Sequence, residues 1–247
     1  MTAPRPAPAP PLDRNQVHVW SIRLPQNGTE PTSLIDLLTE DERLRAARFH
    51  FDIHRTEYIQ AHGVLRVLLA RYLGQPRETR SFLMGAHGKP SLVSGERLRF
   101  NLGHSRERAL VAFADGIEVG VDLERIKDDF PVQEVAHRYF SGAEREAIAA
   151  LPPVRQRAGF FHVWCQKEAY LKGRGDGVTL GLDHFDVAAD PAEPAALLAD
   201  RRDPSAVSRW RLHTLDAGPE YRAALAVECD EVEVRCFEWE PRELLSP

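Results

Sequence analysis

The chain has 247 residues and a formal net charge of −5, from 32 Lys and Arg against 37 Asp and Glu. Hydrophobic residues make up 43% and charged residues 28%, which is an ordinary globular mixture, long enough to bury a sizeable core in one large domain or two small ones. The negative balance argues against bulk attraction to nucleic acid or to anionic membranes, although local basic patches remain possible.

The spacing of the cysteines and the hydropathy of the chain indicate which cellular compartment to expect for the protein. The three cysteines have neither paired nor metal-type spacing, which argues against a disulfide framework and fits a reducing cytosol. No apolar run approaches the roughly 20 residues that cross a bilayer. We therefore expect a cytoplasmic protein that binds neither nucleic acid nor membrane.

The first half of the chain predicts an α+β unit. Residues 1–12 are rich in Pro and Ala and are expected to form a disordered arm. Thr39 and Glu42 have capping-box spacing at the start of a helix, and Gly74 is a plausible stop for a long amphipathic one. In chain order we expect a strand over 16–24, helices over 39–49 and 52–74, a loop over 85–92, and a strand, loop and strand over 98–116.

The second half predicts a similar mixture. Ser141 and Glu144 repeat the capping-box spacing, and Pro152 and Pro153 end that helix. In chain order we expect a strand over 117–126, helices near 131–138 and over 141–151 and 154–173, β structure over 178–187, a surface excursion over 188–206, and strands over 209–215, 221–228 and 232–238.

The two halves share a faint internal echo. The stretch VLRVLLARYLG (64–74) resembles VWCQKEAYLKG (163–173), and RERALVAF (106–113) resembles EYRAALAV (220–227). Two similar α+β halves would explain these matches, and chance would also produce them.

Two acids one residue apart carry the first chemical signal. Asp122 and Glu124 in GVDLER (120–125) would project from the same face of a strand, where like charges repel and resist desolvation. A cation between them would reverse the repulsion, and Mg²⁺ prefers such oxygen ligands. The alternative is that one or both acids are exposed at a strand end.

Two further stretches bear on that choice. On a helix, Glu168 and Lys172 share a face, which could also be an ordinary surface ion pair. The loops GKP (88–90) and NLGHS (101–105) hold a lysine and a histidine suited to phosphate, or simply a turn lysine and a hydrogen-bonded loop histidine.

In order and spacing, these elements together are similar to the 4′-phosphopantetheinyl transferases. The series is G-K-P, N-x-x-H-S, G-V-D-x-E, F-S-x-x-E and W-x-x-K-E-A-x-x-K, and it covers residues from about 40 to about 187. It most resembles the larger single-chain type that activates the carrier proteins of peptide and polyketide synthetases. The resemblance implies two similar α+β halves, 13–116 and 117–240, related by a pseudo-twofold axis with the active site at their interface.

The resemblance also implies an activity. Members move the 4′-phosphopantetheine arm of coenzyme A onto a serine of an apo acyl or peptidyl carrier protein, a holo-[acyl-carrier-protein] synthase activity, and release adenosine 3′,5′-bisphosphate. The expected requirements are coenzyme A, Mg²⁺ and a carrier protein, and the expected state is a monomer. The alternatives are a non-catalytic relative that only binds carrier proteins, and another Mg²⁺-dependent nucleotide phosphotransferase.

The resemblance assigns roles residue by residue. Asp122, Glu124 and Glu168 would hold Mg²⁺, and Glu168 would be the base, directly or through water. Lys172 would stabilise charge on the phosphates, and Lys167 would assist it or orient Glu168. The implied contacts to coenzyme A are Lys89, Pro90, His104 and Ser105, together with Arg48 and Arg55, which could equally be solvated helix arginines. Glu144 is expected to serve the helix cap rather than the chemistry.

Overall fold

The computed structural model describes residues 8–24, 32–75, 81–92, 96–177 and 181–240. Residues 1–7 of the expected arm and 178–180 of the expected β segment lie outside these ranges. Residues 8–12 have no regular secondary structure, and Leu12 packs against the core of the first half.

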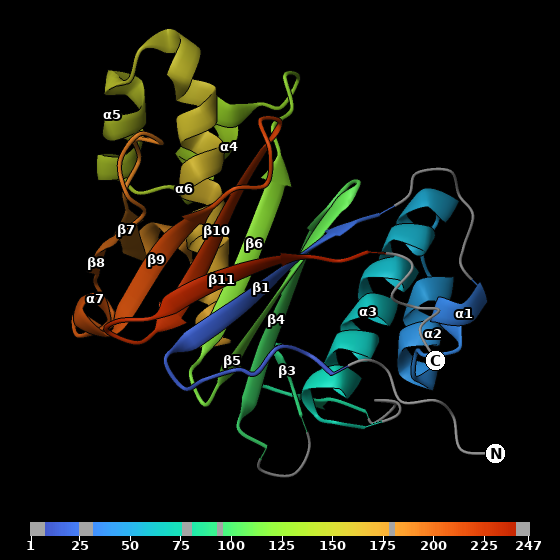
Figure 1. Ribbon diagram of the computed structural model, residues 1–247. Coiled ribbons are helices and arrows are strands. Elements are labelled where there is room, and N and C mark those ends of the chain that lie inside the picture. The colour runs from blue at the N-terminus through green and yellow to red at the C-terminus, as the bar shows by residue number, and fades with distance from the viewer. Residues whose placement is uncertain (1–7, 25–31, 76–80, 93–95, 178–180, 241–247) are drawn as a thin grey trace, which may run out of the picture.

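The molecule is an α+β structure in four layers, helices, sheet, sheet and helices (Figure 1). The first helical layer contains α1 (Thr32–Ile35), α2 (Glu40–Ala47) and α3 (Asp52–Tyr72). The first sheet has the order β11-β1-β5-β4, with β1 (Gln16–Arg23), β4 (Leu98–Ser105), β5 (Arg108–Asp115) and β11 (Glu233–Glu238). The second sheet has the order β6-β10-β9, with β6 (Val119–Arg125), β10 (Tyr221–Glu228) and β9 (Trp210–Leu215).

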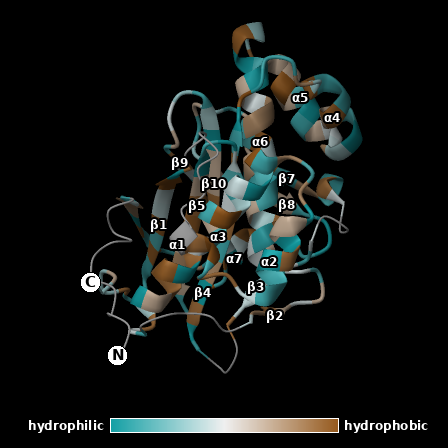
Figure 2. Cartoon of the chain, turned by 90° about the vertical axis from the view of Figure 1, so that its right-hand side faces the viewer, coloured by the Kyte–Doolittle hydropathy of each residue, from teal (hydrophilic) through white to brown (hydrophobic). Residues whose placement is uncertain are grey.

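The second helical layer contains α4 (Val132–Tyr139), α5 (Gly142–Ala150) and the long α6 (Pro153–Arg174). Helices α4 and α5 pack beside the start of α6, at one end of the molecule in both views (Figures 1 and 2). The remaining elements are short: β2 (Leu83–Met84), β3 (Pro90–Ser91), the 3-10 helix η2 (Leu182–His184), β7 (Phe185–Val187), β8 (Leu197–Asp200) and α7 (Ala206–Arg209).

Period-2 alternation in the strands creates three cores. In β5, Val111 and Phe113 face α3, whereas Leu110 and Ala112 face the second sheet. Strand β10 divides in the same way between the core shared by the two sheets and the core under α6. Because successive side chains of a strand point to opposite faces, each sheet is covered on both sides, and the two sheets share one apolar layer.

The helix starts confirm the sequence signals. Thr39 caps α2 and Ser141 caps α5, each accepting from the N3 backbone N–H, while Glu42 and Glu144 accept from the cap N–H. Helix α6 begins at Pro153, where the missing N–H is no loss. It ends at Gly175 in the left-handed region, with φ of 74°.

The expected surface excursion over 188–206 is wrong in part. Ala189, Ala195 and Leu197 are buried against α6, and β8 pairs with β7. Small alanines allow this chain segment to lie close to the helix, so a composition that suggested a loop in fact covers a core. Other residues of the segment are exposed, among them Leu198, Arg201 and Arg202.

The last strand connects the two halves. Strand β11 comes from the range expected for the second half, yet it lies in the first sheet and pairs in parallel with β1, Gln16 opposite Glu233. Each half contributes one long helix against a sheet, α3 and α6. The pseudo-twofold relation between the halves stays a prediction.

Candidate active site

Strand β6 presents its two acids to α6. Val121 and Leu123 are buried in the core between the sheets, so Asp122 and Glu124 project from the opposite face. That face packs on α6. Asp122 is buried and Glu124 half-buried, so Asp122 at least is not a solvated acid at a strand end.

Helix α6 supplies the partner of the acid pair. The Lys172 Nζ lies 2.6 Å from the Asp122 Oδ1 and 3.4 Å from the Val121 carbonyl oxygen. Glu168, one turn earlier, is half-buried and close enough for its charge to act on both Asp122 and Lys172. Lys172 therefore joins helix α6 to strand β6. Helix spacing alone would have suggested a surface ion pair between Lys172 and Glu168.

A glycine sets the distance between strand and helix. A Cβ on Gly120 would lie 2.1 Å from the Ala169 carbonyl oxygen and 2.2 Å from the Gly173 nitrogen. Only the bare backbone of Gly120 lets β6 approach α6 this closely. The contact holds Asp122, two residues further along the strand, against Lys172.

The edge strand β4 of the first sheet completes the site. The Asn101 Oδ1 accepts from the Val121 N–H at 2.8 Å, and the Ser105 Oγ donates to the Glu124 Oε2 at 2.8 Å. Between them, a Cβ on Gly103 would lie 2.9 Å from the Val121 carbonyl oxygen. Ser105 was predicted to contact the cofactor; it lies at the site, where it orients a carboxylate.

Electrostatics identify the three acids as one group, which we call the acidic group: Asp122, Glu124 and Glu168. Burial raises the pKa of Asp122 to about 6, with Lys172 opposing and Glu168 adding to the shift. Burial and then the charge of Asp122 raise the pKa of Glu124, and burial raises that of Glu168. Lys172, with a further effect of Lys127 on Glu124, does not outweigh burial and the mutual repulsion of the three acids.

The chemistry of the acidic group fits a divalent cation. The Asp122 Oδ2 is buried and has no hydrogen-bond partner. Within the described ranges, no three His, Cys, Asp or Glu side chains are gathered as a ready metal site, so the metal-binding role of the three carboxylates stays a prediction. Mg²⁺ usually takes one or two carboxylates and completes its shell with water and phosphate oxygens. Asp122 and Glu124 are donors of that kind.

A cleft with a volume of about 670 Å³ adjoins the acidic group at Lys172. Its walls come from α2, α3, β4, α6 and the β2–β3 segment, and include Arg45, Tyr58, His62, Pro90, His104 and Lys172. A second cavity of about 700 Å³ lies at the ends of β1 and β11 and contains none of the predicted site residues. The first cleft is therefore the candidate substrate site.

His104 stands on the wall of this cleft with an exposed side chain. Desolvation and the nearby positive charges of His62 and Lys172 lower its pKa to about 4. Burial is the largest cause of this shift, and the nearby charges add to it. His104 is neutral at pH 7 and can donate one hydrogen bond to an anion. Its predicted place beside a phosphate is compatible with this position.

Sequence reasoning missed the inner wall of the cleft. Arg66 is buried and donates to Glu42, with Nη2 2.9 Å from Oε1. The Tyr58 ring stacks on His62 at 4.0 Å between centroids. The available signal was Arg66 itself, an arginine on the apolar face of α3 that required a buried partner. Glu42 has the double role of helix cap and counterion.

Several predicted contacts lie elsewhere. Arg55 is half-buried and pairs with Asp52 at 3.2 Å. Arg48 is exposed directly after α2, outside the cleft walls, in a shallow depression beside Arg45. Pro90 lines the cleft, but the Lys89 side chain does not, and its amine contacts Glu118 and the end of α6.

The prediction for Lys167 is wrong. Its side chain is fully buried, and Nζ lies 2.7 Å from the Glu144 Oε1 and from the Leu182 carbonyl oxygen. Adjacent helix residues point about 100° apart, so Lys167 faces η2 and β7 while Glu168 faces β6. Lys167 and Glu144 join α6 to α5, which confirms a structural role for Glu144.

The fold and the site together define a class: a two-sheet α+β protein with a partly buried acidic group beside a cleft whose walls include Arg45, His104 and Lys172, side chains suited to a phosphate-bearing ligand. The family model described as the 4′-phosphopantetheinyl transferase superfamily matches residues 118–226. The chain is 35% identical over 243 residues to the 4′-phosphopantetheinyl transferase HetI of Nostoc sp., covering 95% of each chain. This chain therefore belongs to the 4′-phosphopantetheinyl transferase superfamily, as the motifs predicted.

Other relatives agree. The chain is 27% identical to the 4′-phosphopantetheinyl transferase Sfp of Bacillus subtilis, over 81% of this chain and 87% of that one. A solved holo-[acyl-carrier-protein] synthase from Thermotoga maritima aligns with 46% of this chain and 64% of that one, at 16% identity and a TM-score of 0.35, too weak a likeness to use. Among the described residues, none of the helices has the length and hydropathy needed to span a membrane.

Proposed function

We propose that this chain transfers the 4′-phosphopantetheine arm of coenzyme A to a serine of an apo carrier protein and releases adenosine 3′,5′-bisphosphate. The observation that carries the proposal is the buried acidic group, bound to Lys172 at the edge of a cationic cleft. The relatives named as 4′-phosphopantetheinyl transferases support the same chemistry. The expectations of a monomer and of a cytoplasmic location stay predictions.

The cleft suits a nucleotide with several phosphates. Arg45 and Lys172 supply fixed positive charge, and His104 supplies a neutral donor on the same wall. Tyr58 and His62 offer an aromatic surface. Binding coenzyme A here would place its phosphates beside Lys172, which is also the edge of the acidic group.

The reaction forms a bond between the carrier serine oxygen and phosphorus, and breaks the bond from that phosphorus to the departing bisphosphate. Glu168 is the candidate acceptor of the serine proton, since its raised pKa makes it a stronger base than an exposed carboxylate. Lys172 can stabilise the charge that builds on the phosphate oxygens. Mg²⁺ held by Asp122 and Glu124 would supply further charge neutralisation. Glu168 could serve as base, as metal ligand, or both.

The decisive experiment is intact-mass spectrometry of apo carrier proteins, acyl and peptidyl, after incubation with the purified protein, coenzyme A and Mg²⁺. We expect the mass of one phosphopantetheine arm to be added at a single serine. Asp122→Asn and Lys172→Met should each lower kcat by about 10²- to 10³-fold, since each removes an electrostatic contact at the reacting phosphate. Circular dichroism would show whether each variant is folded.

The matched control is Glu146→Gln, which removes an exposed carboxylate on α5 and should leave the rate unchanged. If several carrier proteins bind but none gains mass, the chain is the non-catalytic relative. Transfer without coenzyme A specificity would indicate another nucleotide phosphotransferase. Full activity of Asp122→Asn would remove the acidic group from the mechanism.

A further inference from the structure

Lys89 lies in a loop that forms part of the cleft wall without adding its own side chain to that wall. The turn before it is fixed by the Gly85 N–H donating to the Lys89 carbonyl at 2.9 Å, and by Gly88 in the left-handed region at φ of 86°. Gly88 and Pro90 line the cleft on either side of Lys89. The Lys89 side chain is not part of the cleft wall.

The Lys89 amine contacts two other segments at once. Its Nζ lies 2.6 Å from the Glu118 Oε2 and also donates to the Gly173 carbonyl at the end of α6. The side-chain stem lies along Gly175, where a Cβ would be 3.1 Å from the Lys89 Cδ. Only 15% of the Lys89 side chain is exposed, so these contacts replace water around it.

Glu118 is itself held in place. The Arg99 Nε on β4 donates to the Glu118 Oε1 at 2.8 Å, so the carboxylate is bound on both oxygens. Burial opposes ionisation of Glu118, but the hydrogen bonds and charges of Lys89 and Arg99 outweigh it and lower the pKa. A lysine that is seated between a carboxylate and a helix C-terminal carbonyl is well compensated, because the last carbonyls of a helix attract cations.

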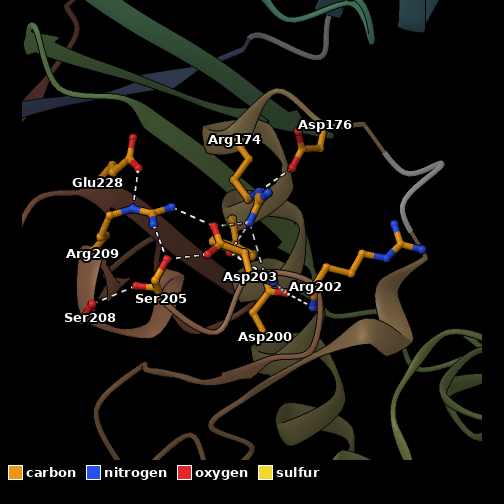
Figure 3. Close-up of polar contacts among 10 residues, drawn as sticks. Arg174, Asp176, Asp200, Arg202, Asp203, Ser205, Ser208, Arg209 and Glu228 are labelled. Carbon is orange, nitrogen blue, oxygen red and sulfur yellow. Dashed lines mark hydrogen bonds and ion pairs between the residues drawn. The ribbon is translucent and has the colours of Figure 1, made fainter.

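The other side of the α6 end is fixed independently. Arg174 contacts Tyr170, Asp176 and Asp200, and Asp203 continues the network to Arg209 (Figure 3). The network joins the helix end to the segment between β8 and β9. On the side of the helix end that faces β6, Lys89 adds to the packing of Gly173 on Gly120 and links the end of α6 to the cleft loop.

We infer that Lys89 is a positioning residue, which holds the end of α6 and the start of β6 to the cleft loop so that Lys172 stays aligned with Asp122. Gly173 directly follows Lys172, and Glu118 precedes Asp122 by four residues, so one side chain controls both sides of that pair. The inference deepens the proposed function and rests on it. It also differs from the sequence-based expectation that Lys89 contacts the nucleotide.

The test compares Lys89→Met, Glu118→Gln and the double variant in steady-state transfer to an apo carrier. We expect each single variant to lower kcat by about 10- to 100-fold, the usual cost of a small misplacement of catalytic groups. The KM for coenzyme A should change little, and the double variant should be no worse than either single one. Lys89→Arg should restore part of the rate, because it can keep the ion pair with Glu118.

A direct nucleotide contact predicts another result. Lys89→Met would then raise the KM for coenzyme A, and Glu118→Gln would lack that defect; either outcome overturns the inference. Arg97→Gln is the matched control, because it removes an exposed ion pair with Asp115 in the same region and should be kinetically silent.

Hydrogen exchange separates this inference from the proposed function, since it needs neither coenzyme A nor carrier. Amides over 172–177 should exchange faster in Lys89→Met and Glu118→Gln than in the wild type, while those in the first half of α6 stay unchanged. If the wild type transfers nothing, the proposed function fails and exchange still reports on Lys89. If the wild type is active and exchange at 172–177 is unaltered, the positioning role is refuted.

Discussion

At the scale of single residues, Asp122 is a buried acid whose placement costs folding free energy but suits a catalytic site. One of its oxygens binds Lys172, and the other is buried without a nitrogen or oxygen donor, although the Cys165 thiol lies beside the carboxylate. Such an orphaned oxygen costs free energy that a purely structural site would avoid. Partial burial, and the charge of a neighbouring acid, also raise the pKa of Glu124 and Glu168. This is the arrangement on which the proposed binding of a cation and a phosphate at this site rests.

Glu42 is also a buried acid, but both oxygens of its carboxylate accept hydrogen bonds, unlike those of Asp122. Two oxygens accept from Arg66, and the Thr39 N–H donates to the Oε2 at 2.9 Å. Burial opposes its ionisation, but His62, Arg66 and the Thr39 backbone outweigh burial and lower its pKa from 4.5 to about 2. A depressed folded-state pKa gives stability above the unfolded pKa, which is lost as the pH falls toward the folded one.

Glu42→Gln should therefore destabilise the protein in a pH-dependent way. The shift corresponds to roughly 3 kcal/mol of unfolding free energy near pH 7, and the difference from wild type should shrink as the pH falls from 4.5 toward 2. Urea denaturation from pH 3 to 7 measures it. Glu40→Gln, at an exposed carboxylate beside it, should show a small difference that does not vary in this way. A gap for Glu42→Gln that stays constant over the range would contradict the assignment.

At the scale of elements, local sequence signals predicted most of the structure. Both capping boxes and the two long helices are confirmed, and so is the placement of Asp122 and Glu124 on one strand face. These features follow from periods of 3.6 and 2 and from caps that act within one turn. They need no knowledge of the fold.

Features that depend on long-range contacts were not predictable in this way. The position of the Lys89 side chain depends on Glu118 and on the α6 end, which is 84 residues away in the chain. The error on Lys167 was avoidable, because its neighbour Glu168 could not share a helix face with it. The alanines of 188–206 suggested a loop because composition does not reveal which surface a segment will cover.

The contact of β6 with α6 gives a prediction about one glycine. Gly120→Ala places a methyl group against the backbone of Ala169 and Gly173, neither of which can rotate away. We expect a loss of about 1–3 kcal/mol or more of unfolding free energy, together with a fall in transfer rate that exceeds the loss of folded protein. Chemical denaturation and turnover on the same samples measure both.

Gly142→Ala is the matched control for Gly120→Ala. A Cβ at Gly142, the first residue of α5, would have only the distant Arg145 side chain nearby, at 4.0 Å. Its effect on stability should stay within about 0.5 kcal/mol. If Gly120→Ala behaves like this control, strand and helix do not need that close approach, and the explanation given for the alignment of Asp122 with Lys172 fails.

At the scale of the whole molecule, the two halves are tied together by the shared core and by β11. The Trp239 N–H donates to the Ser21 carbonyl at 2.8 Å, and the buried indole packs under Arg71, 4.9 Å from the ring. Just before it, Phe237 stacks on Trp20 at 4.9 Å between centroids. The end of the chain therefore stabilises the first sheet, although the chain reaches it only after completing the second. Folding of either half alone would leave apolar surface exposed.

Trp239→Ala tests this coupling. Removing a buried indole should cost about 3–5 kcal/mol of unfolding free energy, and the loss should be felt in both halves. We expect one transition that shifts as a whole, coincident by circular dichroism and by tryptophan fluorescence, which reports on Trp20 in the first half and on Trp164 and Trp210 in the second. Leu198→Ala, at an exposed position on β8, should leave the transition in place. Two separated transitions in Trp239→Ala would instead mean that the halves fold independently, and the alignment of β4 with β6, on which the acidic group depends, would then need another source.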